Sequence, residues 1–371
     1  MWNWQQSDWP NFRFDKDRLE ALEAQFHHRA GRVVGAFTHL DENEQTELTV
    51  GLLSEEALST SAIEGEVLER ASVQSSLRKQ FGLVSGGPTN AASEQGIAEL
   101  AMDLYRSYRV PLAHSTLYRW QAMLMRGRAG VGEVGAYRCG EEPMQVVSGP
   151  TYRRVVHFEA PPSARVPGEM DGLVRWFNAT RDDGLGPLAR AGLVHLYFVS
   201  VHPFEDGNGR IARALSEKSL AQSYDAPTLT ALSMTIEARR REYYGALAAA
   251  NGRNEVSAWL VWFAETVLAA QELSLRWVGF FVEKAKYLRR LASEFNPRQK
   301  KVILRMLREG PLGFKGGLSA GNYSRIAGAP PATARRDLVR LVGLGALLRT
   351  GERKGTRYWL PFVPPEPSRE S

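Results

Sequence analysis

Residues 202–213, HPFEDGNGRIAR, bring together the kinds of side chain that chemistry on a polyphosphate requires. His202 can act as a general base near neutral pH. Asp206 offers the carboxylate oxygens that Mg²⁺ prefers, usually alongside phosphate oxygens. Arg210 and Arg213 lie three positions apart, so a helix presents them on one side, where each guanidinium can hold a phosphate through two N–H groups. The segment therefore predicts a phosphate site with a metal ion and a base beside it.

The glycines of this segment predict how the anion is held. Pro203 ends the apolar helix before it and leaves His202 at a helix terminus. Gly207, Asn208 and Gly209 then open the next helix, whose N–H groups and positive N-terminal end favour an anion. Taken singly, a histidine after a helix is usually structural, DGNG is usually a turn, and paired arginines usually face solvent. Their conjunction in one short segment favours the functional interpretation.

The segment resembles the signature of the Fic family, H-x-F-x-(D/E)-G-N-G-R-x-x-R, at every specified position. The resemblance implies a protein adenylyltransferase, a Mg²⁺-dependent enzyme that moves AMP from ATP onto a Ser, Thr or Tyr hydroxyl of a target protein, the enzyme itself included. It implies that His202 deprotonates that hydroxyl, that Phe204 anchors the segment in the core, and that Asp206 binds Mg²⁺. It also implies that ATP is bound by five residues of this segment, Gly207, Asn208, Gly209, Arg210 and Arg213.

Two further stretches extend the resemblance. Residues 233–251 are similar to the helix that follows the signature in the family, which implies that Tyr243 and Asn251 lie near the nucleoside. Gly135, Tyr137 and Arg138 resemble the start of the family's flap, a hairpin that aligns target side chains, and strands are expected at residues 144–148 and 154–158. The expected flap residues are Val146, Val147, Ser148 and Gly149. The sequence contains no Walker-type GxxxxGK(S/T) segment, which excludes a P-loop nucleotide site.

A second motif, TSAIEG at residues 60–65, matches the family pattern (S/T)-x-x-x-E-(G/N). By itself it describes a polar helix end closed by a glycine C-cap. The resemblance implies more: Glu64 lies at the ATP site and pairs with Arg213, where it competes with the γ-phosphate for the same N–H donors. ATP then binds with its α-phosphate misaligned for attack. We therefore expect an enzyme inhibited by its own glutamate.

The same residues leave other functions open. With Glu64 retained, the site can support removal of AMP from a modified protein, or transfer of another phosphate-containing group. A different class of function is a DNA-binding regulator whose site only senses nucleotide. The intact combination of base, metal ligand and arginines favours an enzyme.

The elements that position these residues are predicted to be mostly α-helical. We expect a helical N-terminal extension with the inhibitory motif at residues 1–110, a Fic-type helical core with a small β-hairpin flap at 111–292, and a winged helix at 293–371. Aromatic residues near the start, Trp2, Trp4 and Trp9 among them, predict an arm pinned onto the body.

The winged helix is predicted to be basic on two of its elements. Arg335, Arg336 and Arg340 lie on the expected recognition helix, and the expected wing carries Arg349, Arg353, Lys354 and Arg357. These residues suit DNA phosphates. Winged helices also serve as docking modules, so a protein partner or a homodimer stays an open alternative.

Composition sets broad limits on these functions. The chain has 371 residues, a formal charge of +6 and a single cysteine, Cys139. One cysteine forms no intramolecular disulfide, which fits a reducing compartment. No apolar run approaches the roughly 20 residues that a membrane helix needs, and the N-terminus has no apolar signal segment. We therefore expect a cytoplasmic protein without a membrane partner.

Overall fold

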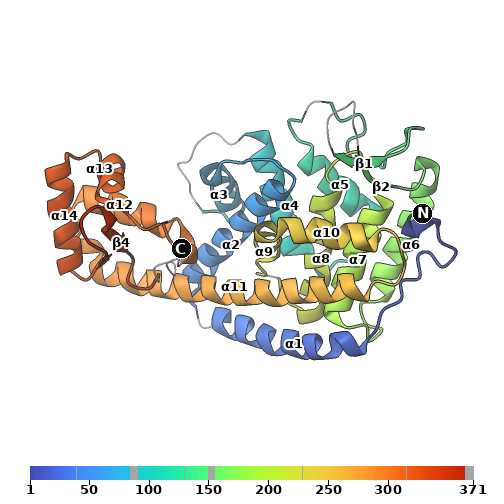
Figure 1. Ribbon diagram of the computed structural model, residues 1–371, viewed down its shortest axis with the longest axis horizontal. Helices are drawn as coiled ribbons and strands as arrows, with labels where there is room; N and C mark the ends of the chain where they lie inside the picture. Colours follow the sequence, from blue (N-terminus) through green and yellow to red (C-terminus); the bar gives the residue numbers. More distant parts are fainter. Residues whose placement is uncertain are drawn as a thin grey trace. The chain divides into compact units, whose positions relative to one another are not determined.

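The computed structural model describes residues 1–38, 40–83, 91–128, 130–148, 155–227, 229–314 and 316–363. Within these ranges the chain is mainly helical and carries two small two-stranded sheets (Figure 1). The mostly α fold expected from the sequence is therefore confirmed. No helix in these ranges has the length and apolar character needed to cross a membrane.

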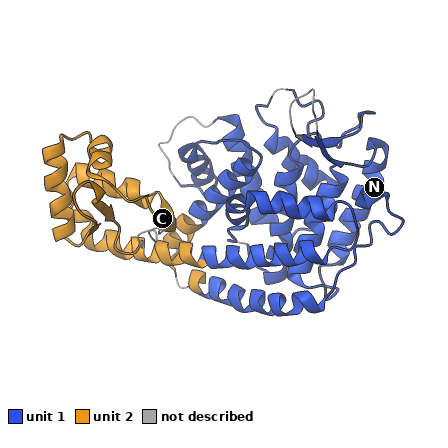
Figure 2. Cartoon of the chain, viewed as in Figure 1, with its two compact units in different colours: residues 1–35, 49–274 blue, residues 36–48, 275–371 orange. Residues whose placement is uncertain are grey.

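The chain divides by its internal contacts into two compact units (Figure 2). Unit 1 comprises Met1–Gly35 and Thr49–Ser274, and unit 2 comprises Ala36–Leu48 and Leu275–Ser371. The last boundary falls inside a long helix, α11 (Ser257–Leu291). The three functional segments expected from the sequence stay a prediction.

Unit 1 is built around one buried helix. Nearly every residue of α7 (Pro187–Val201) is buried, and α8 (Asn208–Tyr224) packs along it. One apolar cluster joins α7 to α3, α4, α5 and α6, and a second joins it to α1, α9, α10 and α11. The bounds of the surrounding helices are α1 Asp17–Thr38, α2 Glu42–Ile63, α3 Arg70–Gln80, α4 Ala92–Ser107, α5 His114–Leu124, α6 Val166–Ala179, α9 Leu232–Ala238 and α10 Arg240–Ala250, with short 3₁₀ turns at Asn3–Gln5 and Ser163–Arg165.

A tight loop joins α7 to α8 and carries the signature. α7 ends at Val201 and is capped by His202, whose backbone is left-handed (φ 49°); Pro203 follows, which has no N–H to continue the helix. α8 begins directly after Gly207, whose φ of 91° suits glycine. The loop is thus held between two helices of the core, which gives its side chains a rigid base.

The predicted flap is a hairpin of β1 (Gln145–Ser148) and β2 (Val155–Glu159). The strands are antiparallel, with Gln145 opposite Glu159, and the pairing shifts between Val146 and Val147. These strands agree with the expected ones to within a residue. Gly149, which we predicted to be a flap residue, lies outside the described residues.

The described part of unit 2 that follows α11 contains three helices and then a hairpin. The helices are α12 (Pro297–Leu307), α13 (Ala320–Ala327) and α14 (Pro331–Gly343), and the strands are β3 (Leu348–Thr350) and β4 (Arg357–Trp359). Short 3₁₀ turns lie at Ala292–Glu294, Gly310–Leu312 and Arg353–Gly355. Leu318 pairs with Tyr358 beside the hairpin. This is the order of elements that the predicted winged helix requires.

Candidate active site

His202 lies at the end of α7 with one ring nitrogen anchored. Its Nδ1 lies 3.4 Å from the carbonyl oxygen of Val199, and a carbonyl can only accept a hydrogen bond. Nδ1 therefore carries the proton, which leaves the lone pair on Nε2. The ring is partly buried, and this burial lowers its pKa to about 4, so the imidazole is neutral at physiological pH. A neutral ring with a free Nε2 is what a general base requires.

The loop after His202 is fixed by internal hydrogen bonds. Asn208 accepts from the backbone N–H of Phe204 (3.0 Å) and donates to its carbonyl (2.7 Å), so its buried side chain closes the loop on itself. The ring of Phe204 is fully buried. Arg138 braces the loop from the flap side, donating to the carbonyl of His202 at 2.8 Å and to that of Pro161 at 2.6 Å. The base and the root of the flap are thus tied together.

Arg213 meets Glu64 at the start of α8. Its Nη2 lies 2.8 Å from Glu64 Oε1, and the guanidinium is 1% exposed while the glutamate side chain keeps 31%. Thr60, the first residue of the inhibitory motif, accepts from Arg213 Nε through its hydroxyl (2.7 Å). A Cβ on Gly209 would lie 2.4 Å from Glu64 Oε1, so the carboxylate occupies the space above the helix end. Glu64 therefore stands where an anion would bind.

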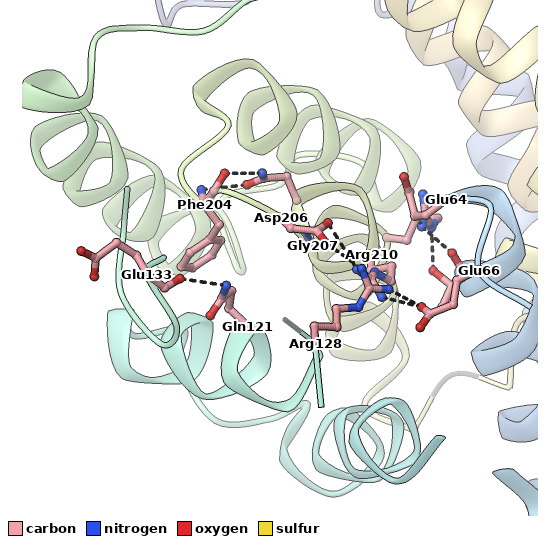
Figure 3. A network of polar contacts seen from close by, with 12 residues as sticks. Glu64, Glu66, Gln121, Arg128, Glu133, Phe204, Asp206, Gly207 and Arg210 are labelled. Carbon is pink, nitrogen blue, oxygen red and sulfur yellow. Dashed lines mark hydrogen bonds and ion pairs between the residues drawn. The ribbon is translucent and has the colours of Figure 1, made fainter. Parts of the chain in front are cut away.

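Arg210 belongs to a second network that the sequence did not predict (Figure 3). Its Nη1 lies 2.9 Å from Glu66 Oε2, and its Nη2 lies 3.4 Å from Asp206 Oδ1. Arg128, from the loop after α5, contacts the same two carboxylates, Asp206 at 2.7 Å and Glu66 at 2.6 Å. Arg128 and Glu66 were missed because neither belongs to a specified position of a motif. The sequence did hold one signal for Glu66: it is a second acidic residue directly after the glycine of the inhibitory motif, in the segment EGE at residues 64–66.

Unpartnered donors show that the site suits phosphate. Arg213 Nη1 and Arg210 Nε are buried and have no hydrogen-bond partner among the described residues. Buried donors of this kind call for a ligand, since leaving one unsatisfied costs about 1–3 kcal/mol. The first N–H groups of any helix also lack intrahelical partners, and α8 begins at Asn208 beside them. The arginines and the helix end therefore fit a polyphosphate.

The residues present also fit Mg²⁺. Asp206 is 41% exposed and already holds a cationic group. Among the described residues no three His, Cys, Asp or Glu side chains form a metal cage. Mg²⁺ needs no such cage where substrate phosphates complete its shell, because one or two carboxylates then suffice.

Two other predicted site residues lie in α10 and at its end. Tyr243 is buried and its hydroxyl lies 2.9 Å from Nε2 of His195, within the core. Asn251 lies at the end of α10, where its carbonyl accepts from Asn3 N–H (2.7 Å). The neighbouring Tyr244 donates to the carbonyl of Ile63 (3.1 Å), at the end of α2. Tyr243 lies beside Arg213: burial raises the pKa of its hydroxyl, and the nearby positive charge of Arg213 opposes that rise. Contact of Tyr243 and Asn251 with a nucleoside stays a prediction.

The flap valines are exposed at the surface. Val146 and Val147 are 41% and 40% exposed, and Val155 and Val156 across from them are 52% and 41% exposed. The backbone of Ser148 lies at the end of β1. The hairpin therefore presents these four valines to solvent, while Phe158 of β2 is buried against the N-terminal arm.

Comparison with protein families places this site in a known group. Residues 111–220 match the Fic/DOC family, and residues 2–83 match a domain of unknown function, DUF4172. The chain therefore carries a Fic/DOC family domain, and the recognition made from the signature is confirmed.

Individual relatives match over short regions. Protein adenylyltransferase fic-1 of Caenorhabditis briggsae is 36% identical over 83 residues, which cover 22% of this chain and 15% of the nematode protein. Protein adenylyltransferase Fic of Drosophila grimshawi is 31% identical over 112 residues, covering 28% of this chain and 22% of the insect protein. The matched regions thus span less than a quarter of either relative.

A solved structure matches over most of its length. A Fic family protein from Desulfovibrio desulfuricans G20 has a TM-score of 0.54 at 21% identity, covering 91% of this chain and 95% of that one. At this identity the match shows a shared fold.

Proposed function

We propose that this protein transfers AMP from ATP to a hydroxyl side chain of a protein, in a Mg²⁺-dependent reaction that Glu64 holds in check. The observation that carries the proposal is the combination at the start of α8: a histidine with a free Nε2, unpartnered arginine donors, and a carboxylate seated in the anion site. The names of the relatives, protein adenylyltransferases, support the same reaction.

The residues divide the reaction among them. Nε2 of His202 takes the proton of the target hydroxyl as its oxygen bonds to the α-phosphorus of ATP, and the bond to the β-phosphate oxygen breaks, releasing pyrophosphate. Arg210, Arg213 and the N-terminal N–H groups of α8 bind the phosphates and stabilise their charge. Mg²⁺ bound at Asp206 would neutralise phosphate charge. The exposed edge of the flap can align an extended target segment beside the histidine by strand addition.

Glu64 inhibits by occupying the place of a phosphate. Its carboxylate takes a donor of Arg213 and fills the space above Gly209. ATP that enters with Glu64 in place cannot seat its γ-phosphate on Arg213, so its α-phosphate points away from the line of attack. Arg213 is buried while Glu64 is partly exposed, so the carboxylate neutralises a guanidinium that solvent does not reach, which favours the inhibited state.

The test is incubation with α-labelled ATP and Mg²⁺, followed by a search for labelled protein, the enzyme included. Glu64→Gly should increase labelling, since it vacates the phosphate position. Arg213→Ala should not, because it frees the glutamate but removes the phosphate partner. The Glu64→Gly, His202→Ala double variant is the control for chemistry and should not label. Equal gains from Glu64→Gly and Arg213→Ala would refute competition for one guanidinium.

The same site can run toward removal of AMP. Glu64 keeps 31% of its side chain exposed, so its carboxylate can reach a water molecule as well as Arg213. Wild-type protein that strips label from a pre-labelled target, when Glu64→Gly does not, would establish this direction.

A second function, DNA binding, is favoured by the charge of unit 2. Residues 297–363 carry 14 basic and 3 acidic side chains, a formal charge of +11, whereas the whole chain carries +6 and the remainder therefore −5. On α14 the basic residues Arg335, Arg336 and Arg340 are exposed, as is Val339 at 67%. The acid of this helix, Asp337, is buried and bonds to the Tyr323 hydroxyl (3.0 Å). One face of α14 is therefore purely basic and apolar.

Binding of this face to duplex DNA should weaken steeply with salt, because phosphate contacts release counterions. Arg335→Ala with Arg336→Ala should reduce both the affinity and the slope against salt. Lys300→Ala with Lys301→Ala removes the same charge from α12 and is the matched control. If no binding occurs at low salt, α14 is a docking face for a protein.

A further inference from the structure

We propose that Arg128 and Glu66 are internal stand-ins for the substrate, with the guanidinium of Arg128 held where the metal cation would bind and the carboxylate of Glu66 where a phosphate would bind. This inference rests on the proposed function, because it assigns Asp206 to the metal and Arg210 to phosphate. It adds a second lock to the site, distinct from the Glu64–Arg213 pair.

Four charged groups form a closed ring (Figure 3). Asp206 contacts Arg128 (2.7 Å) and Arg210 (3.4 Å), and Glu66 contacts the same two guanidinium groups (2.6 and 2.9 Å). Each arginine thus spans both carboxylates, and the two positive charges balance the two negative ones. The ring uses the predicted metal ligand and one predicted phosphate ligand at the same time.

The two sides of the ring differ in burial. Arg210 is 2% exposed. Glu66, Arg128 and Asp206 are 21%, 27% and 41% exposed, so these three can move toward solvent. Arg210 is therefore the fixed partner, and Arg128 and Glu66 are the groups that a ligand can displace.

The charges of the incoming ligand match those of the displaced pair. A divalent cation at Asp206 replaces Arg128, and a phosphate at Arg210 replaces Glu66. Because Arg128 and Glu66 also contact each other, they can leave together as an ion pair with both charges compensated. This makes displacement less costly than breaking a single buried ion pair, which strands one charge.

Glu66 and Glu64 act on different arginines from the same turn. Gly65 between them has a φ of 84°, and Glu64 and Glu66 lie on either side of it. Glu64 contacts Arg213 and Glu66 contacts Arg210. One glycine turn therefore delivers two carboxylates to the two phosphate-binding arginines of α8.

Cation binding to the nucleotide-free protein tests the role of Arg128. Mn²⁺ serves as the probe, measured by titration calorimetry or by the loss of the free-ion resonance signal. Arg128→Ala should raise the Mn²⁺ affinity roughly 3- to 30-fold, the range that one partly exposed charge-assisted contact covers. Arg126→Ala is the matched control, since Arg126 pairs with Glu99 at 2.6 Å and not with Asp206; it should leave the affinity unchanged.

Nucleotide binding tests the role of Glu66. Binding of a non-transferable ATP analogue without metal should tighten by a similar factor in Glu66→Gln, which keeps the side-chain shape and removes the charge. Arg128→Lys, with a single point charge that cannot span both carboxylates, should fall between wild type and Arg128→Ala in the Mn²⁺ titration, and it covers the case that the alanine variant misfolds.

Two results would overturn the inference. Unchanged Mn²⁺ affinity in folded Arg128→Ala would show that Arg128 does not compete for Asp206. Weaker analogue binding in Glu66→Gln would show that Glu66 supports the site instead of blocking it. Neither measurement requires AMP transfer, so the inference can fail while the proposed reaction stands, and a failed transfer assay leaves the binding results interpretable.

Discussion

At the scale of single residues, the chemistry depends on the state of His202. The left-handed backbone at this position turns the ring out of the helix, where the Val199 carbonyl fixes its protonated nitrogen. Burial then lowers the pKa of the ring to about 4. The residue is therefore a neutral base throughout the physiological range, and pairing with a carboxylate is not needed to orient it.

His202 should titrate near pH 4 in the folded protein, well below the usual 6.5. Because the folded-state pKa is lowered, the base stays active as the pH falls through 6, and the stability that the neutral ring contributes is lost between about pH 6.5 and 4. Histidine-selective NMR titration checks the pKa, with His202→Gln identifying the resonance. His202→Ala should reduce transfer by roughly 10²- to 10⁴-fold while ATP binding persists. A midpoint near 6.5 would contradict the structural assignment.

The sequence predicted the residues of the signature better than their partners. Arg213 was expected beside Glu64, and the structure shows that pair, because both positions are specified by motifs that state which residue types must meet. The ion pairs of Arg128 and Glu66 were not predicted, because pairing between segments far apart in sequence depends on the path of each loop. Tyr243 and Asn251 were predicted from helix similarity alone, which does not show that the buried Tyr243 hydroxyl contacts His195 and lies beside Arg213.

At the scale of elements, the end of α2 combines two interpretations that the sequence kept apart. Glu66 N–H donates to the carbonyl of Ser61 (3.0 Å) and Gly65 N–H to that of Ala62 (2.9 Å), which is the Schellman pattern of a glycine-capped helix. The same turn directs Glu64 onto Arg213. The glycine cap of α2 is thus the local structure that positions the inhibitory carboxylate.

Gly65→Ala should destabilise the turn at the end of α2 that positions Glu64. A side chain at a φ of 84° costs about 1–2 kcal/mol, although no neighbouring atom lies within 4 Å of the added Cβ. The strain falls on the turn that carries both carboxylates, so transfer should rise, by less than in Glu64→Gly, and the melting temperature should drop by a few degrees. Gly31→Ala, in α1 with equally open space and ordinary helix geometry, is the control for both readings. AMP transfer by Gly65→Ala equal to that of the wild type would show that this turn does not keep Glu64 in its inhibitory position.

The N-terminal arm shows what pattern alone could and could not predict. Its aromatic residues were expected to be pinned to the body, and Trp4 Nε1 donates to the Glu159 carbonyl on β2 at 2.7 Å. Asn3 is buried and donates to the Ser200 hydroxyl on α7 at 2.7 Å. Composition could predict burial of the rings, but it could not show that the arm ties the flap to the helix that carries the base.

At the scale of the whole molecule, two compact units carry different chemistry. Unit 1 holds every residue of the proposed transfer reaction, from Glu64 to Arg213. Unit 2 holds the region with a formal charge of +11. The overall formal charge of +6 conceals this separation, which is why composition predicted only a mildly basic protein.

The two proposed activities should therefore be separable by substitution. Arg335→Ala with Arg336→Ala lies entirely in unit 2, so it should lower DNA affinity at low salt several-fold and leave labelling by a Glu64→Gly background unchanged. Glu64→Gly by itself should raise labelling and leave DNA affinity unchanged, since its contacts lie within unit 1. Filter binding and α-labelled transfer, measured on the same preparations of the full chain, check both. If DNA changes labelling in Glu64→Gly, and the arginine pair abolishes that change, the units communicate and the activities are coupled instead of independent.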